Sequence, residues 1–340
     1  MKDSILPLGK LPPQLAAQLL NQIPQLDPRV ILGPGVGLDC AVLDFGETCL
    51  VMKSDPITFV TKDIGWYAVQ ICANDIATTG AQPRWFLTTL LLPEGKTTPE
   101  MVLLINQQVA QTCQEKGISV IGGHTEITYG LDRPILVGTM IGEVAKSDLV
   151  TPKNAQPGNK LLLSKGIPIE GTAIIAKEFP ERLSSILNEA ELKSAVNAIY
   201  DPGISVLRDA QLAVKAGQVT AMHDPTEGGL ASALWELAEA CGHTLIIQQQ
   251  HISISLISQK ICNFFQLNPM ATIASGALLL AVEAKDSQTI CNELIRHGIP
   301  CSEIGFIEAG SAVVYSEEGS NRLQLPRPER DEITRLFENP

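Results

Sequence analysis

The sequence predicts a two-domain protein in which helices and strands alternate, and three features indicate this. Short apolar runs rich in β-branched residues alternate with stretches of helical periodicity, and Gly and Pro residues separate them. The chain has 340 residues, more than one average domain of roughly 150 residues. A polar segment with two prolines and a glycine, Lys146–Lys160, interrupts the pattern. We therefore expect domains at 1–148 and 149–328, and a charged tail at 329–340.

The elements of the first domain follow from the spacing of apolar residues and from glycines that end helices. Gly80 closes one expected helix and Gly117 ends a second, longer one. A turn that contains glycine separates the first two strands. In chain order, we expect a helix at Leu11–Ile23, strands at Ala41–Phe45 and Thr48–Lys53, a helix at Asp63–Thr79, a strand at Trp85–Leu92, a helix at Thr98–Lys116, and strands at Ile118–Ile121 and Ile135–Val144.

The second domain shows the same alternation. Several helices are expected before Gly217, and the helix that follows Gly228 carries an apolar face that predicts core packing. The tail from Pro326 is charged, so we expect it to end in a short exposed helix. The remaining expected elements are strands at Leu161–Ser164, Val219–Met222, Ala277–Val282 and Ser311–Tyr315, and helices at Gly228–Cys241 and Asp286–His297.

Composition and charge exclude several classes of protein. The chain is 45% hydrophobic and 18% charged, which excludes global disorder. Its net charge of −12, with no basic block interleaved with aromatic residues, excludes nucleic acid as an expected partner. No apolar stretch has the length of a membrane span, and no secretion signal is visible. Eight cysteines without a C-x-x-C pair are typical of reduced thiols, so we expect a cytoplasmic protein.

Four carboxylates stand at the ends of apolar elements or within them. Asp39 follows two glycines and precedes a strand, Asp55 ends a strand, Asp75 lies in a helix, and Asp224 follows a strand. A few carboxylates together with phosphate oxygens are the ligands that Mg²⁺ takes in proteins. The four acids therefore predict a site for magnesium and phosphate.

Asp75 is the most informative of the four. By i, i+3 and i, i+4 spacing it shares a helix face with Ile71, Cys72 and Thr79, which predicts that it is not freely solvated. It also lies in the C-terminal half of its helix, where the helix dipole disfavours negative charge. A nearby cation would remove both costs. The alternative is a hydrogen bond from a neighbouring loop.

The segment Asp224–Gly229 allows two interpretations. Asp224 at the N-cap, Pro225 at the first position and Glu227 at the third would form a variant capping box for the next helix. Alternatively, Gly228 and Gly229 let a phosphate approach exposed N–H groups at the helix N-terminus. The local sequence favours neither.

A second pair of adjacent glycines, Gly122 and Gly123, follows an expected strand and permits close approach of a ligand to the backbone. His124 comes next; it either binds metal or phosphate or is a satisfied, partly buried histidine, which is the commoner case. No sequence signature indicates a covalent nucleophile.

Five motifs in order resemble the aminoimidazole ribonucleotide (AIR) synthase superfamily, and the match is best with its HypE-like branch. They are G-V-G-L-D-C-A-V (Gly35 to Val42), S-D-P-I (Ser54 to Ile57), N-D-I-A-T-T-G-A-Q-P (Asn74 to Pro83), G-G-H-T (Gly122 to Thr125) and D-P-T-E-G-G-L (Asp224 to Leu230). The resemblance implies a PurM-like N-terminal α/β domain that forms a dimeric β-barrel and a PurM-like C-terminal α+β domain.

The resemblance also implies a site for ATP and Mg²⁺ in a homodimer. Members of the superfamily activate an acceptor by phosphoryl transfer from ATP, and some then dehydrate it. Alternatives are a small-molecule kinase resembling thiamine-monophosphate kinase and a non-catalytic nucleotide-binding or scaffold protein. The implied roles are catalysis for Asp75 and His124, metal binding for Asp39, Asp55, Asp75 and Asp224, and ATP or phosphate binding for Asn74, Gly122, Gly123, Thr125, Thr226, Gly228 and Gly229.

Four departures from the family pattern bear on these expectations. Leu38 replaces an acid of the first motif, His124 stands where the HypE-like branch has aspartate, and Glu227 stands where that branch has arginine. The last cysteine is Cys301, whereas that branch carries its substrate group on a C-terminal cysteine. We therefore do not expect the cyanide-ligand chemistry of that branch, and the acceptor stays open.

Overall fold

The chain forms two compact units, described here from a computed structural model that covers residues 6, 9, 11–35, 37–58, 60–319 and 321–338. The N-terminal unit comprises Gln25–Gly33 and Asp39–Leu149. The C-terminal unit comprises Met1–Pro24, Pro34–Leu38 and Val150–Pro340. The last change of unit, between Leu149 and Val150, falls within the polar segment Lys146–Lys160, whereas residues 11–24 group with the C-terminal unit.

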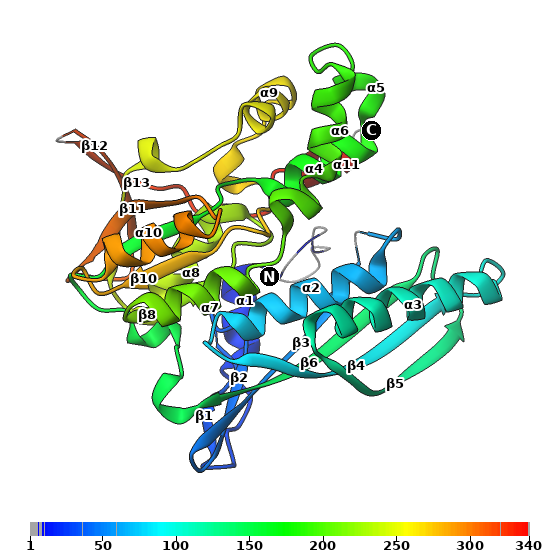
Figure 1. Ribbon diagram of the computed structural model, residues 1–340, viewed down its shortest axis with the longest axis horizontal. Helices are drawn as coiled ribbons and strands as arrows, with labels where there is room; N and C mark the ends of the chain where they lie inside the picture. The colour runs from blue at the N-terminus through cyan, green and yellow to red at the C-terminus, as the bar shows by residue number, and fades with distance from the viewer. Residues whose placement is uncertain are drawn as a thin grey trace. The chain divides into compact units, whose positions relative to one another are not determined.

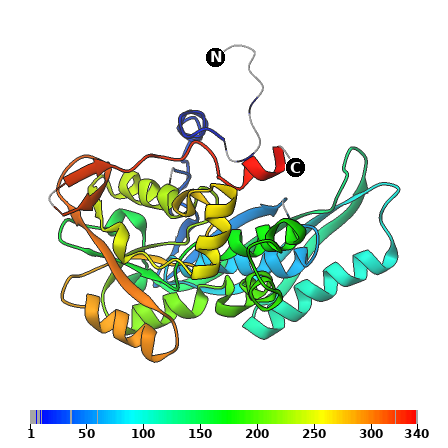
Figure 2. The ribbon, with the colours of Figure 1, turned by 90° about the horizontal axis from the view of Figure 1, so that it is seen from above.

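The N-terminal unit is built on a six-stranded sheet with the order β1-β2-β3-β6-β4-β5 (Figure 1). Neighbouring strands are antiparallel except β4 and β5, which are parallel. The long helix α3 connects this parallel pair and runs back along the strands (Figure 2). The strands are β1 (Val30–Leu32), β2 (Ala41–Phe45), β3 (Thr48–Ile57), β4 (Gln82–Pro93), β5 (Ser119–Thr128) and β6 (Ile135–Ala145).

Two helices, α2 (Ile64–Ala77) and α3 (Pro99–Lys116), complete this unit. Almost every residue of α2 is buried, because α2 packs against β3, β6 and α3. The α3 helix begins where the Thr98 side chain accepts a hydrogen bond from Met101 N, and ends at Gly117 in the left-handed conformation. Both helices match the expected ranges.

The C-terminal unit contains a seven-stranded sheet with the order β13-β12-β9-β11-β7-β10-β8, in which only the β12 and β9 pair is parallel. Helix α8 packs its apolar face, with Leu230 and Leu234, into a core with Leu161 and Leu279 of the sheet. The strands are β7 (Lys160–Ser164), β8 (Val219–His223), β9 (Thr244–Ile247), β10 (Leu279–Val282), β11 (Cys301–Glu308), β12 (Val314–Glu318) and β13 (Asn321–Gln324). The helices are α1 (Pro13–Leu20), α4 (Ile169–Glu178), α5 (Pro180–Leu183), α6 (Glu189–Asn197), α7 (Leu207–Ala216), α8 (Gly229–Cys241), α9 (Leu256–Phe265), α10 (Ser287–Arg296) and α11 (Thr334–Glu338).

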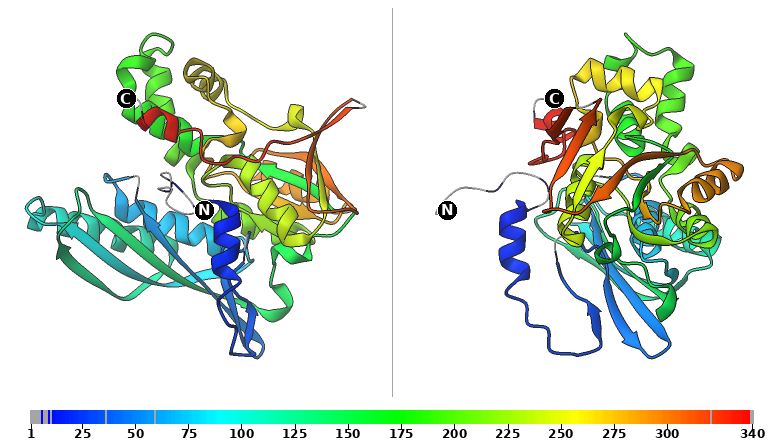
Figure 3. Two further views of the ribbon diagram at one scale, coloured as in Figure 1. Left: turned by 180° about the vertical axis from the view of Figure 1, so that it is seen from behind. Right: turned by 90° about the vertical axis from the view of Figure 1, so that its left-hand side faces the viewer.

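The end of the chain departs from the expected exposed helix. Ile333, just before α11, and Leu336 within it are buried in a core cluster that includes Leu183 and Phe265. Figure 3 (left) shows the short red helix against the green helices of this unit. The expectation was wrong because Ile333 and Leu336, three residues apart, lie on one face, and that face packs against the core.

The two-domain α/β class is thus confirmed. β1 and β5 stand at the two ends of the N-terminal sheet, so the dimeric barrel stays a prediction. None of the eight cysteines, all of which lie in the described ranges, forms a disulfide. Among the described helices, none combines the length and the apolar content needed to cross a membrane.

Candidate functional site

Three of the four carboxylates predicted to bind metal converge on one lysine in the N-terminal unit. Lys53 Nζ lies 3.5 Å from Asp75 Oδ2, 4.0 Å from Asp39 Oδ1 and 4.0 Å from Asp55 Oδ1. Lys53 and Asp55 are two residues apart on β3 and therefore share a face of the sheet. Asp75 comes from α2, which packs on β3, and Asp39 comes from the loop before β2. Three separate segments thus place their carboxylates around one point.

The cluster ranges from buried to partly exposed. The exposed fraction of the side chain is 4% for Asp75, 16% for Lys53, 27% for Asp39 and 35% for Asp55. Burial alone would lower the pKa of Lys53, but the carboxylates, Asp75 foremost, raise that pKa well above its ordinary value. The ammonium is therefore charged at neutral pH. Asn74, which precedes Asp75 in α2, is fully buried.

Lys53 is the cation that Asp75 needs, and sequence reasoning missed it. Lysine is mostly exposed in proteins, and side chains of a strand point alternately to its two faces, so we expect a lysine in such a strand to face solvent. Only the packing of α2 on β3 brings Asp75 within 3.5 Å of the ammonium. The three carboxylates supply oxygen atoms, the ligands that Mg²⁺ prefers, and in this structure the ammonium of Lys53 lies at the point where they converge.

The G-G-H-T motif lies inside β5 and not after a strand, which corrects the expected end at Ile121. β5 continues to Thr128 because it pairs in parallel with β4 along that whole length. Gly123 has a φ of +154°, and a Cβ there would lie 2.3 Å from Thr88 O. Because Gly123 has no side chain, the backbone of β4 can lie beside it. A Cβ at Gly122 would meet only Leu87 Cδ2, at 3.7 Å.

His124 and Thr125 are exposed on this edge strand. The His124 side chain is 67% exposed and its Nε2 lies 3.3 Å from Glu126 Oε2, so the alternative of a partly buried histidine does not hold. β5 is three strands away from β3, which corresponds to roughly 14 Å at the usual strand spacing. Within one chain, His124 is not part of the cluster around Lys53.

In the C-terminal unit, Asp224 is buried directly after β8. The preceding residue, His223, is also buried, and its Nε2 lies 2.8 Å from Glu236 Oε2 on α8. Sequence reasoning missed this pair. The one available signal was the position of His223 at a strand end, directly before Asp224. The carboxylate partner of His223, Glu236, could not be identified because it comes from the middle of the next helix.

Of the two interpretations of Asp224–Gly229, the capping box does not form. Helix α8 begins at Gly229 with Gly228 as N-cap, and both glycines have positive φ, +78° and +61°. Gly228 N donates to Asp331 Oδ2 at 2.6 Å, and Gly229 N donates to Thr226 O at 3.0 Å. The two N–H groups expected to bind phosphate are therefore engaged within the chain.

The glycine at 229 is also required by packing. A Cβ on this residue would lie 2.6 Å from the carbonyl oxygens of Met270 and Thr272. Such a distance is far shorter than a van der Waals contact, so the loop at 270–272 could not keep its place beside α8. The carbonyl groups of Met270 and Thr272 therefore take the space beside Gly229 in which a ligand had been expected.

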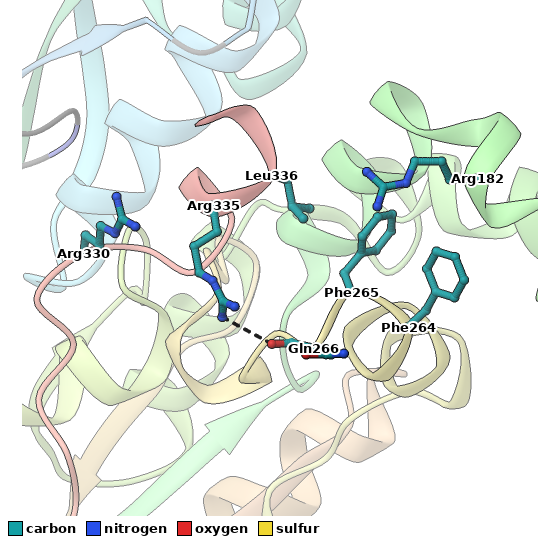
Figure 4. Close-up of a pocket in the computed structure, with 7 residues that line it drawn as sticks. All are labelled: Arg182, Phe264, Phe265, Gln266, Arg330, Arg335 and Leu336. Atoms are coloured by element: carbon teal, nitrogen blue, oxygen red, sulfur yellow. Dashed lines mark hydrogen bonds between the residues drawn. The ribbon is translucent and has the colours of Figure 1, made fainter. Parts of the chain in front are cut away.

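A pocket of about 410 Å³ lies elsewhere in the C-terminal unit (Figure 4). The guanidinium of Arg182 stacks over Phe265 at 4.7 Å, and Arg335 contacts both Glu332, at 2.8 Å, and Gln266 O, at 3.3 Å. These contacts give both arginines structural partners. No residue of the predicted site lines the pocket, whose walls are Arg182, Phe264, Phe265, Gln266, Arg330, Arg335 and Leu336.

Two family models match the chain in order. The model of AIR synthase related proteins, N-terminal domain, matches residues 37–144, and the model of the C-terminal domain matches residues 156–316. Together they cover most of the 340 residues.

Relatives and solved structures agree with these models. A putative hydrogenase expression/formation protein of Methanocaldococcus jannaschii is 29% identical over 89% of this chain and 90% of its own. Carbamoyl dehydratase HypE of Cupriavidus necator is 27% identical over 73% and 69% of the two chains. The crystal structure of hydrogenase maturation protein HypE in complex with ATP has a TM-score of 0.71 at 22% identity, over 94% and 91%. The chain therefore belongs to the AIR synthase superfamily, within its HypE-like branch.

Proposed function

We propose that this protein is a cytoplasmic, Mg²⁺-dependent enzyme that transfers a phosphoryl group from ATP to an acceptor. The observation that carries the proposal is the convergence of Asp39, Asp55 and Asp75 around the ammonium of Lys53. It is supported by the ATP complex of a protein of the same fold and by the carbamoyl dehydratase activity named for a relative. The acceptor, a small molecule or a group on a protein, is not identified.

The chain's own residues have defined tasks in this proposal. Asp39, Asp55 and Asp75 hold a divalent cation with carboxylate oxygens. Bound Mg²⁺ would neutralise charge on the transferred phosphate. Asp75, the most buried of the three, fixes the cluster against the rigid helix α2. Because phosphoryl transfer depends on positioning and electrostatics, no protein nucleophile is required.

We further propose that the protein is a homodimer that pairs through β5. All but the last side chain of β5 are exposed, and β5 is an edge strand. Its apolar residues Val120, Ile121 and Ile127 are exposed, and Tyr129 follows them. Exposed apolar edges of this kind associate with another strand unless they are covered. A second copy would place His124 at the interface.

The first experiment is a thermal-shift titration with ATP, with and without Mg²⁺. A ligand at 100 times its Kd stabilises the native state by about 2.7 kcal/mol. We expect stabilisation by ATP that requires Mg²⁺, followed by ADP release when the acceptor is supplied from a panel of hydroxylated and phosphorylated metabolites and candidate proteins. Absence of any shift at millimolar Mg·ATP would refute the proposal.

A non-catalytic, nucleotide-binding role is the second candidate, and two observations favour it. Lys53 already lies among the metal-binding acids, and Asp331 already accepts the hydrogen bond from Gly228 N. If ATP stabilises the protein but no acceptor stimulates ADP release, this second role is supported and the enzymatic one is not.

A further inference from the structure

We propose that the pocket shown in Figure 4 binds a small organic anion, in which a phosphate or carboxylate group is joined to an aromatic or apolar body. The pocket lies in the C-terminal unit, whereas the acid cluster around Lys53 lies in the N-terminal unit. The inference therefore goes beyond the proposed function and does not depend on it.

The size and the walls of the pocket suit a small molecule. Its volume of about 410 Å³ falls within the range of roughly 300–1,000 Å³ that is usual for such sites. The walls come from α5, from the end of α9 and from the segment around α11, which are far apart in the sequence. One residue of each segment is buried in a common core cluster, and these are Leu183, Phe265 and Leu336. The packing of this cluster fixes the walls relative to one another.

The walls carry positive charge, although the chain as a whole has a net charge of −12. Among the described residues that line the pocket, three are arginines and none is acidic. Arg335 pairs with Glu332 at 2.8 Å, and both side chains are partly exposed. Because ion pairs at exposed positions contribute little stability, Arg335 can exchange Glu332 for the oxygen of a ligand.

Arg182 is the residue that most directly indicates an anion. Its guanidinium stacks over Phe265 at 4.7 Å and over Phe179 at 5.6 Å. These rings hold the guanidinium in place, but they carry no net negative charge. In the part of the chain that the structure describes, no carboxylate pairs with Arg182 and no group accepts a hydrogen bond from its guanidinium. Its N–H donors are therefore available in the planar arrangement that binds two oxygens of a phosphate or carboxylate.

The aromatic residues of the pocket favour an anion with an apolar body. Phe264 is 40% exposed, and its ring meets the ring of Phe265 edge to face, with 4.9 Å between the centroids. The ring of Phe264 thus offers apolar surface next to the ring that the guanidinium of Arg182 covers. Inorganic phosphate would leave this surface in water, whereas a flat apolar group would bury it.

Isothermal titration calorimetry of the full chain tests the proposal with four probes, which are phenyl phosphate, benzoate, inorganic phosphate and phenol. The buffer contains EDTA, so that no divalent ion attracts phosphate to the acids around Lys53. We expect phenyl phosphate or benzoate to bind at one site per chain, at least tenfold more tightly than inorganic phosphate or phenol, and more weakly as the salt concentration rises. The aromatic anion with the higher affinity shows whether the site recognises phosphate or carboxylate.

Two variants assign the binding to this pocket. Arg182→Gln removes the charge, and Arg296→Gln, at an exposed position on α10 of the same unit, is the matched control. We expect Arg182→Gln to weaken binding of the aromatic anion at least tenfold and Arg296→Gln to leave it unchanged. Phe264→Ala keeps every arginine of the pocket and changes a partly exposed position, so it keeps the test decisive if Arg182→Gln is poorly folded. It should weaken binding of the aromatic anion and leave that of inorganic phosphate unchanged.

Two results would overturn the proposal. The first is that the wild type binds neither aromatic anion, and the second is that folded Arg182→Gln or Phe264→Ala binds the aromatic anion as tightly as the wild type does. Both results would leave the proposed function standing, because Mg·ATP is assigned to acids of the other unit.

Discussion

Glu170 is a buried carboxylate whose replacement should stabilise the protein in a pH-dependent manner. It lies in the first turn of α4, it is 5% exposed, and its Oε2 has no hydrogen-bond partner among the described residues. Burial raises the pKa of Glu170 from 4.5 to about 7, and the carboxylates of Asp331 and Glu227 add to this effect. The native state therefore holds a proton that the unfolded chain releases at lower pH.

The sign and size of the effect follow from this pKa. Between pH 4.5 and about 7 the native state binds more protons than the unfolded state, so the stability falls as the pH rises through this window. Above about pH 7 Glu170 is ionised in both states, and the full free-energy cost of burying its charge is reached. The pKa of Glu170 differs by about 2.5 between the native and the unfolded state, which corresponds to about 3 kcal/mol. Glu170→Gln has the same shape and no charge. We expect it to raise the free energy of unfolding by up to about 3 kcal/mol at pH 8 and by little at pH 4.5.

Urea unfolding followed by tryptophan fluorescence measures this effect, because Trp235 lies in the same unit. The matched control is Glu178→Gln, an exposed position on the same helix, which should change stability by a few tenths of a kcal/mol at most, at both pH values. An equal gain at pH 4.5 and pH 8, or no gain at pH 8, would refute the reasoning.

Three further predictions concern the proposed site, the dimer and the glycine loop. Asp75→Asn removes the carboxylate nearest Lys53 and should abolish the Mg²⁺-dependent thermal shift with ATP, whereas an unchanged shift would exclude a metal role. Ile127→Lys on the exposed edge of β5 should convert the proposed dimer to monomer in light scattering after size exclusion. Gly229→Ala should cost about 2–5 kcal/mol in urea unfolding, and Gly298→Ala, whose Cβ would meet nothing within 4 Å at a φ of +79°, should cost only about 1 kcal/mol.

Sequence reasoning located elements well where local signals decide them. The α3 helix matches its expected range because the Thr98 cap and Gly117 are encoded within the segment itself. β5 was cut short because Gly122 and Gly123 weaken local strand propensity, and the strand is continued only by its pairing with β4. Long-range pairing of this kind cannot be read from a local pattern.

The same distinction applies to the candidate site. Three acids were identified because each stands beside small residues at or within an apolar element, and the structure brings all three to Lys53. Lys53 itself was missed because its role depends on a helix that follows in the chain. The capping box failed for a similar reason, because Asp331, more than 100 residues away, binds Gly228 N in place of a local side chain.

Adjacent glycines were interpreted in both motifs as places where a ligand approaches the backbone, and β5 allows this interpretation to be tested. A Cβ at Gly123 would lie 2.3 Å from Thr88 O, whereas one at Gly122 would meet a single side-chain atom at 3.7 Å. Gly123→Ala should therefore lower the free energy of unfolding in urea strongly, and Gly122→Ala should leave it within about 0.5 kcal/mol of the wild type. Since Gly122→Ala keeps the fold, nucleotide binding by this variant reports on ligand approach alone. Unchanged binding would mean that the glycines of β5 serve strand packing and not ATP; a tenfold or greater loss of affinity would assign Gly122 to the nucleotide site.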